Sequence, residues 1–310
     1  MDILLILLLA VVIDFAFGDP PDAIHPVAWM GGVASYLKRG AGSQSRMVQF
    51  IYGIGMVLVI MGLFAVPVYF GLLYLKSVSI VAYIVVGAVL FKLTFSVKGL
   101  RRAALVIKGH LGQNRLDKAR FELRALVSRD TRELTRPMII SSTVESVAEN
   151  SNDSFVAPLF YFLLFGVPGA VAYRVVNTLD AIIGYHGEYE YLGRFASRLD
   201  DVLNFIPARL TALFLVLAAF LAGKDGRGAW RIARHEHSRT ESPNAGWPMA
   251  AMAGALKVKL EKSGHYALGE PLSALKPTTI DDALQLMYIT VAVWLIACGL
   301  AGGIYLVLAT

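Results

Sequence analysis

This sequence has little of what characterises a soluble enzyme. Only 17% of its 310 residues are charged, and Cys298 is its single cysteine. One cysteine excludes an intramolecular disulfide. The scarcity of charge, together with a mean hydropathy of +0.59, excludes an ordinary soluble domain.

Several common catalytic signatures are also missing. The chain contains no G-x-x-x-x-G-K-[ST] phosphate loop, no H-E-x-x-H, no C-x-x-C pair and no G-x-S-x-G elbow. Standard metalloprotease, redox and hydrolase functions therefore lose support. We find no internal repeat, which counts against a repeat-built transporter, and no segment that alternates like a series of strands.

Apolar runs of membrane length define the fold class instead. The main runs are 3–17, 47–75, 77–97 and 283–310. Two further runs are ambiguous, because 154–173 is interrupted by prolines and glycines and 210–223 is short. We expect an all-α, polytopic membrane protein with amphipathic cytoplasmic helices and candidate re-entrant segments around a site.

The basic loops predict the topology. Segment 98–136 holds eleven Lys and Arg against four Asp and Glu, and segment 224–262 is also basic. Since cytoplasmic loops carry such an excess, both segments are placed inside, and the two ambiguous runs must cross as a pair or not at all. The alternative places 185–206 outside.

The expected organisation is one integral membrane domain over 1–310. Cytoplasmic helical insertions are predicted at about 98–153 and 224–282, the first containing two amphipathic helices, 100–111 and 116–127, joined at Gly112-Gln113-Asn114. We expect Lys92 to snorkel at the end of its run. The net charge of +6 is attributed to topology and anionic lipid, so no nucleic-acid partner is predicted.

Polar residues at the edges of these runs are the candidate site, since ionisable groups near a bilayer are costly. Glu145 and Glu149 are four residues apart on one helix face, and Asn150 and Asp153 follow. Paired carboxylates repel unless they share a cation, so Glu145, Glu149 and Asp153 are candidate Mg²⁺ ligands. The alternative is that both glutamates face water and Asp153 only caps the next helix.

A second group lies on the helix expected around 171–184. Arg174, Asn177 and Asp180 share one side with Tyr173, and aliphatic residues occupy the other side. This polar stripe indicates a helix that lines a water-filled pocket. The alternative is an Arg174–Asp180 pair that only locks helices together.

A third group extends over 194–209, and its members are Arg198, Asp200, Asp201, Asn204 and Arg209. Arginine can hold a phosphate or carboxylate through two parallel hydrogen bonds. A surface ion pair between Arg198 and Asp201 is the alternative, and the spacing alone favours it.

Two turn-rich motifs complete the candidates. Asp19 lies in Gly-Asp-Pro-Pro, which ends a helix, and His25 follows, although a lone histidine is more often structural than catalytic. Asn244 lies in a turn before a Met/Ala/Gly helix at 249–256. That helix either binds an anion at its N-terminus or uses small residues for close packing.

Taken together, these motifs resemble the CobD/CbiB family of cobalamin-biosynthesis membrane proteins, the adenosylcobinamide-phosphate synthases. The matching blocks, in order, are GDPP…HPV at 18–27, VSRDT at 127–131, VESVAEN…D…APLF at 144–160, NTLD…GY at 177–185, RLDD…N…PARLTA at 198–212 and PNAGWPMAAMAGAL at 243–256. After Leu256 the expected glycine-rich continuation is replaced by KVKLEKSGHYALGE.

The resemblance implies a reaction. Adenosylcobyric acid is joined through an amide bond to aminopropanol or its O-phosphate, driven by ATP with Mg²⁺, at the cytoplasmic side of a bacterial or archaeal cell membrane. The motif acids Glu145, Glu149, Asp153, Asp180, Asp200 and Asp201 would supply metal ligands and a base. Arginines 174, 198 and 209 would hold phosphates. Whether other late pathway enzymes dock here is left open.

Two rival functions are kept. A membrane regulator of the related AmpE type, without synthase activity, should lose the GDPP…HPV and PNAGWPMA blocks, and this chain retains both. A transporter of a polar solute predicts repeats, more spans and few long motif-bearing loops.

Overall fold

The computed structural model of this chain describes residues 2–41, 45–184 and 190–308. It divides into two compact units: unit 1 is Met1–Ser96 with Ala157–Asn204, and unit 2 is Val97–Val156 with Phe205–Thr310. Both predicted insertions, 98–153 and 224–282, fall within unit 2. Tyr185, the last residue of the 177–185 motif, lies outside the described residues.

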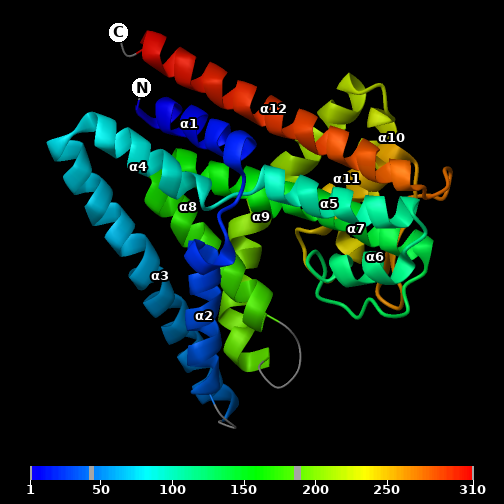
Figure 1. The fold of residues 1–310 in the computed structure, drawn as a ribbon, viewed down its shortest axis with the longest axis horizontal. Coiled ribbons are helices and arrows are strands. Elements are labelled where there is room, and N and C mark those ends of the chain that lie inside the picture. Colours follow the sequence, from blue (N-terminus) through cyan, green and yellow to red (C-terminus); the bar gives the residue numbers. More distant parts are fainter. Residues whose placement is uncertain (1, 42–44, 185–189, 309–310) are drawn as a thin grey trace. The chain divides into compact units, whose positions relative to one another are not determined.

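Unit 1 is built from helices with apolar faces. Its elements are α1 (Asp2–Phe17), η1 (Asp22–Ile24), α2 (Pro26–Arg39), α3 (Arg46–Val78), α4 (Ile80–Lys92), α8 (Ala157–Ile183) and the first part of α9 (Glu190–Leu221). Helix α1 packs on α4, and α2 and α3 pack on α8. In Figure 1 the long α3 turns sharply into α4, where the Ser79 hydroxyl accepts from the Ala82 amide and caps α4.

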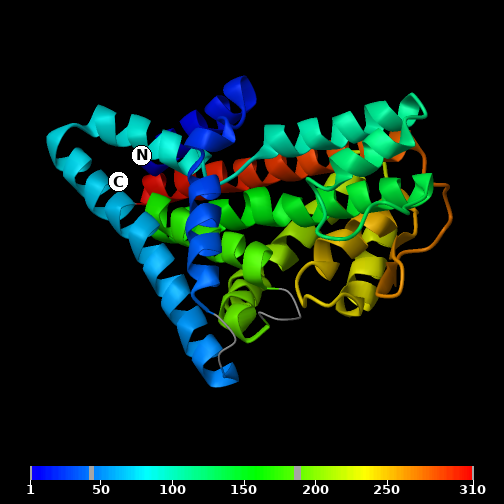
Figure 2. The same cartoon turned by 60° about the horizontal axis from the view of Figure 1, so that its bottom comes forward.

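Unit 2 contains the amphipathic helices. Its elements are α5 (Val97–Gly112), α6 (Leu116–Leu123), α7 (Arg136–Ser151), the π-helical turn η2 (Asn152–Val156), the rest of α9, α10 (Gly226–Glu236), η3 (His237–Arg239), α11 (Gly246–Leu256), β1 (Leu260–Lys262), β2 (Tyr266–Leu268) and α12 (Pro277–Leu308). Figure 2 shows α5, α7 and α12 side by side, and all three are in mutual contact. Helices α10 and α11 approach so closely that a side chain at Gly254 would collide with the Gly228 carbonyl.

The predicted fold class is confirmed. Five described helices are long and apolar enough to cross a membrane: Arg46–Val78, Ile80–Gly112, Arg136–Ile183, Glu190–Leu221 and Pro277–Leu300. The predicted hairpin of α5 and α6 is also present, with Asn114 at a positive φ of 54° in the connecting turn. Asparagine tolerates this left-handed conformation better than most residues.

Three expectations about elements need correction or refinement. The ambiguous runs belong to long helices, α7–η2–α8 and α9, although Gly166 does break α8, with a φ of 67° and a ψ of −164°. Helix α6 ends at Leu123, short of the predicted Val127. The chain also has one antiparallel hairpin, β1–β2, where no strand was expected, because three-residue strands are too short to show alternation.

The expectation that Lys92 snorkels is wrong. Its side chain is only 3% exposed, and its ammonium lies 2.9 Å from Asp14 Oδ1 and 2.5 Å from Asp19 Oδ1. Asp14 itself is fully buried in α1. The three charges therefore join α1, α4 and the turn after α1, and each compensates the desolvation of the others.

Replacement of Lys92 by methionine should destabilise the protein strongly, because two carboxylates lose their cation. A broken buried pair costs about 3–5 kcal/mol, which corresponds to a fall in Tm of roughly 10 °C. Thermal unfolding in detergent measures it. The matched control is Lys76→Met, since Lys76 and Asp2 form an exposed pair at 3.4 Å that contributes at most about 1 kcal/mol. Equal shifts in Tm for the two variants would contradict the buried-triad account.

Candidate functional site

The first polar cluster, in unit 2, is centred on Glu145 of α7. This carboxylate is 3% exposed, so it does not face water as the alternative interpretation supposed. Its Oε1 accepts from the Ser141 hydroxyl at 2.6 Å, and its Oε2 accepts from Arg129 Nη2 at 2.8 Å and from the Tyr266 hydroxyl at 3.0 Å. Three donors on one buried carboxylate make a pre-organised anionic group.

Both oxygens of Glu145 accept hydrogen bonds, and its assignment as a Mg²⁺ ligand stays a prediction. Glu149 lies one turn further along α7 and is half-buried, and Asp153 follows in η2. The helix runs on without interruption from α7 through η2 into α8, so Asp153 is not the cap of a new helix. Among the described residues, no three His, Cys, Asp or Glu side chains form a group that could hold a metal ion.

Tyr266, on β2, is a functional candidate that motif spacing did not identify. Burial raises the pKa of its hydroxyl, and the nearby Glu145 and Glu149 carboxylates raise it further. The hydroxyl is thus held as a neutral donor to Glu145. A second bond, from the Glu261 amide to the Ser141 hydroxyl at 2.9 Å, ties the hairpin to α7. The sequence offered little to identify Tyr266, because it lies in the segment 257–270, where the family motifs no longer match.

The PNAGWP motif forms a second cluster in unit 2. Asn244 is buried, and its Oδ1 accepts from Arg209 Nη1 at 3.2 Å. The Arg209 guanidinium lies 3.6 Å above the Phe205 ring and 5.2 Å from the Trp247 ring, which stacks on His237. Helix α11 begins at Gly246 and is buried along nearly its whole length, which supports close packing as one role of this motif.

The polar groups of unit 1 meet between α8 and α9. Asp200 accepts from Asn204 Nδ2 at 2.9 Å and from Asn177 Nδ2 at 3.4 Å. Asn204 is buried and accepts from the Tyr173 hydroxyl at 2.9 Å, while Arg174 donates to Asn177 at 3.3 Å. Four predicted site residues, Arg174, Asn177, Asp200 and Asn204, are therefore brought together.

Among the described residues, neither of the two alternative ion pairs, Arg174–Asp180 and Arg198–Asp201, is formed. Asp180 is half-buried and accepts from the Ser197 hydroxyl. Arg198 is exposed, and within the described chain it makes no ion pair with Asp201, which is half-buried.

Asn150, at the end of α7 in unit 2, donates to the Ser146 carbonyl and accepts from the Ser154 hydroxyl. These bonds indicate that its amide mainly supports the helix turn.

Asp19 and His25 occupy the turn between α1 and α2. Burial raises the pKa of Asp19, but the hydrogen bonds from Lys92 and Ser96 outweigh it and leave the pKa below its usual value. His25 caps α2, its Nδ1 accepting from the Val27 amide at 3.2 Å. Burial lowers the pKa of His25, and Asp19 opposes this shift while Lys92 and Arg174 reinforce it.

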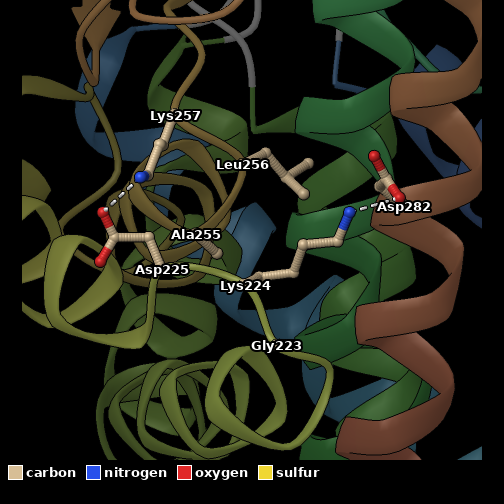
Figure 3. A pocket seen from close by; sticks show the side chains of 7 residues that line it. All are labelled: Gly223, Lys224, Asp225, Ala255, Leu256, Lys257 and Asp282. Atoms are coloured by element: carbon tan, nitrogen blue, oxygen red, sulfur yellow. Dashed lines mark hydrogen bonds and ion pairs between the residues drawn. The ribbon is translucent and has the colours of Figure 1, made fainter.

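A separate cavity of about 380 Å³ lies in unit 2 (Figure 3). It is lined by the link between α9 and α10, the end of α11 and Asp282 of α12. Two ion pairs bound it, Lys224–Asp282 at 2.6 Å and Lys257–Asp225 at 3.6 Å. It contains none of the predicted site residues.

Comparison with known proteins decides the family. The model of the CobD/Cbib protein family matches residues 7–295. The chain belongs to the CobD/CbiB family. It is 55% identical to "Cobalamin biosynthesis protein CobD" of Dehalococcoides mccartyi (strain CBDB1), over 96% of each chain. It is 40% identical to "Probable cobalamin biosynthesis protein CobD" of Methanothermobacter thermautotrophicus, over 98% of each chain.

The family match confirms the resemblance drawn from the motifs. It covers every predicted site residue and also the segment 257–270, including Tyr266, where the motif pattern alone had thinned. A third CobD/CbiB relative, "Probable cobalamin biosynthesis protein CobD" of Thermoplasma volcanium, is 35% identical over 92% of this chain and 93% of its own. No solved structure matches the chain.

The lowered pKa of His25 predicts loss of stability in acid. The unfolded chain binds this proton more readily than the folded one, so stability falls as the pH drops below about 6.5 and through the lower folded-state pKa. His25→Asn keeps a capping acceptor without the titration, and should flatten the dependence of Tm on pH between 7 and 5. The control is His235→Asn, at an exposed position. If Tm of His25→Asn depends on pH as steeply as that of the wild type, another titrating group causes the loss of stability in acid.

Proposed function

We propose that this chain is an adenosylcobinamide-phosphate synthase of cobalamin biosynthesis. It joins the free carboxylate of adenosylcobyric acid to aminopropanol or its O-phosphate by an amide bond, with ATP as the energy source. The observation that carries the proposal is that this member of the CobD/CbiB family keeps the buried Glu145 paired with Arg129 in unit 2, and the half-buried Asp200 hydrogen-bonded to Asn177 beside Arg174 in unit 1, within a largely apolar chain. Such groups are costly there unless they serve a site.

The proposed reaction has two steps. A carboxylate oxygen of the acid takes the γ-phosphoryl group of ATP, giving an acyl phosphate and ADP. The amine nitrogen then attacks the acyl carbon, the C–O bond to phosphate breaks, and amide and inorganic phosphate leave. The first step needs cations beside the phosphoryl charge. The second step also needs a base, because the attacking amine must lose its ammonium protons.

The side chains suit these tasks. Arg209, supported by Asn244 and the Phe205 ring, and Arg174, beside Asn177, would contact phosphoryl or carboxylate oxygens. Asp200, which accepts hydrogen bonds from two asparagine amides, is the carboxylate proposed as the base for the ammonium proton. Oxygen ligands for Mg²⁺ would come from Glu149 and Asp153, because this ion commonly takes one or two protein carboxylates together with substrate phosphates. When bound, the ion would neutralise phosphate charge.

The direct test is synthesis by purified protein in detergent or nanodiscs. Adenosylcobyric acid, ATP, Mg²⁺ and each amine in turn are supplied, and the amide product is detected by mass spectrometry. ATP-dependent product with either amine supports the proposal. Absence of product with both amines, from folded protein, would favour a regulator of the AmpE type, and flux of a polar solute across vesicles would favour a transporter.

Glu149→Gln should lower kcat for synthesis about a hundredfold or more, since it removes a carboxylate proposed to hold Mg²⁺ at the reacting phosphates. Folding and membrane insertion should be unchanged, as judged by Tm and extraction behaviour. The control, Glu133→Gln, changes an exposed carboxylate between α6 and α7 and should retain wild-type rate. Normal turnover by Glu149→Gln at ordinary Mg²⁺ concentration would remove Glu149 from the site.

The proposal also requires the motif-bearing segments to face the cytoplasm, because ATP is cytosolic and a charged corrinoid does not cross lipid unaided. Single cysteines at three exposed positions, Asp117, Arg194 and Glu241, test this in a Cys298→Ala background. All three should react with an impermeant thiol reagent only from the cytoplasmic side. Reaction of the cysteine at 194 from the side opposite to that at 117 would withdraw Arg198, Asp200 and Asp201 from the proposed active site.

A further inference from the structure

Arg129 occupies a position that the predicted site did not include. It lies in the connection between α6 and α7, and its side chain is 18% exposed. Its Nη2 donates to the Ser142 hydroxyl and to Glu145 Oε2, both at 2.8 Å. The guanidinium is thus attached to the first polar cluster through one nitrogen.

The rest of the Arg129 guanidinium remains available. Within the described chain its Nε and Nη1 groups make no hydrogen bond, and neither is fully enclosed. Arginine has five N–H donors in a rigid plane, so one guanidinium can bind Glu145 and still offer three N–H groups to a ligand. A lysine ammonium has only three donors in all.

The connection between α6 and α7 is also held by hydrogen bonds that do not involve Arg129. The Thr131 hydroxyl donates to the Arg120 carbonyl at 2.8 Å, and Arg120 Nε donates to the Leu134 carbonyl at 2.9 Å. The Ser146 hydroxyl donates to the Leu126 carbonyl at 3.1 Å. Since these bonds already hold the segment on both sides of Arg129, the Arg129–Glu145 pair is not explained by anchoring alone.

Glu145 and Tyr266 fix the direction of the guanidinium. Glu145 is itself held by Ser141 and Tyr266, so its Oε2 is a fixed acceptor for Arg129. The hairpin β1–β2 supplies Tyr266 and is tied to α7 by the bond between Glu261 and Ser141. This chain of contacts positions Arg129 before any ligand arrives, which lowers the entropic cost of binding.

We infer that Arg129 binds an oxyanion of the substrates, either a phosphoryl group or the carboxylate to be activated, and that Glu145 and Tyr266 are positioning residues for it. The inference rests on the proposed function for the identity of the ligand. Glu145 is the carboxylate that pairs with Arg129, and the three N–H groups on Nε and Nη1 are the donors proposed for the oxyanion.

Steady-state kinetics of two Arg129 variants test the inference. Arg129→Gln should raise one KM about 10- to 100-fold, because charge-assisted hydrogen bonds are lost, and Arg129→Lys should give an intermediate value. A higher KM for ATP or for aminopropanol O-phosphate identifies a phosphoryl ligand, and a higher KM for adenosylcobyric acid identifies the carboxylate. Unchanged KM values for all three substrates in folded Arg129→Gln would overturn the inference, even if kcat falls.

Tyr266→Phe tests the positioning role with the loss of a single hydroxyl. It should raise the same KM by a smaller factor, roughly 3- to 10-fold. The matched control is Tyr52→Phe, which removes a tyrosine hydroxyl donating at 2.9 Å to the Leu37 carbonyl in unit 1. Similar changes in Tm for the two variants, with a higher KM only in Tyr266→Phe, support the positioning role. If Tyr266→Phe has the same KM as the wild type, Tyr266 does not position Arg129.

A binding measurement separates failure of this inference from failure of the proposed function. If the wild-type protein makes no amide, thermal unfolding is followed in chloride, inorganic phosphate and acetate at equal ionic strength. Phosphate or acetate should raise the Tm of wild type and not that of Arg129→Gln. No difference between the anions, or equal stabilisation of wild type and variant, would show that Arg129 is not an oxyanion site.

Discussion

Every ionisable group buried in an apolar chain must have a partner, because desolvation of an isolated charge costs several kcal/mol. Lys92 with Asp14 and Asp19, and Glu145 with Arg129, satisfy this requirement, and the half-buried Asp200 accepts from asparagine amides. The elements that supply these partners are therefore held together: α1 with α4, α7 with the hairpin β1–β2, and α8 with the first part of α9. The same pairing that permits burial also orients the polar groups before substrate binds.

The helices of this protein were largely predictable, since apolar run length and loop charge are local properties. Contacts between distant segments were not. Lys92 meets Asp19 across 73 positions, and Tyr266 meets Glu145 across 121. Spacing on one helix correctly grouped Arg174 with Asn177. It could not place Arg129 and Tyr266 beside Glu145, because they come from other segments of the chain. The order of the six motif blocks along the chain identified the family, whereas the spacing of residues on single helices did not.

Each unit holds both acidic and basic groups. Unit 1 contains Asp200 with asparagine donors, Arg174 beside Asn177 and the turn of Asp19 and His25. Unit 2 contains Glu145, Glu149 and two supported arginines, Arg129 and Arg209. Amide synthesis from a carboxylate needs both kinds of group, a base for the amine and cations for phosphoryl transfer.

Isotope transfer tests the central claim, that the carboxylate is activated by ATP as an acyl phosphate. Adenosylcobyric acid carrying ¹⁸O in both oxygens of its free carboxylate is turned over with ATP, Mg²⁺ and the amine. The account predicts one ¹⁸O atom in the inorganic phosphate released for each amide formed, because the carboxylate oxygen leaves with the phosphoryl group. Amide formation with unlabelled phosphate, or with ¹⁸O in AMP, would contradict it.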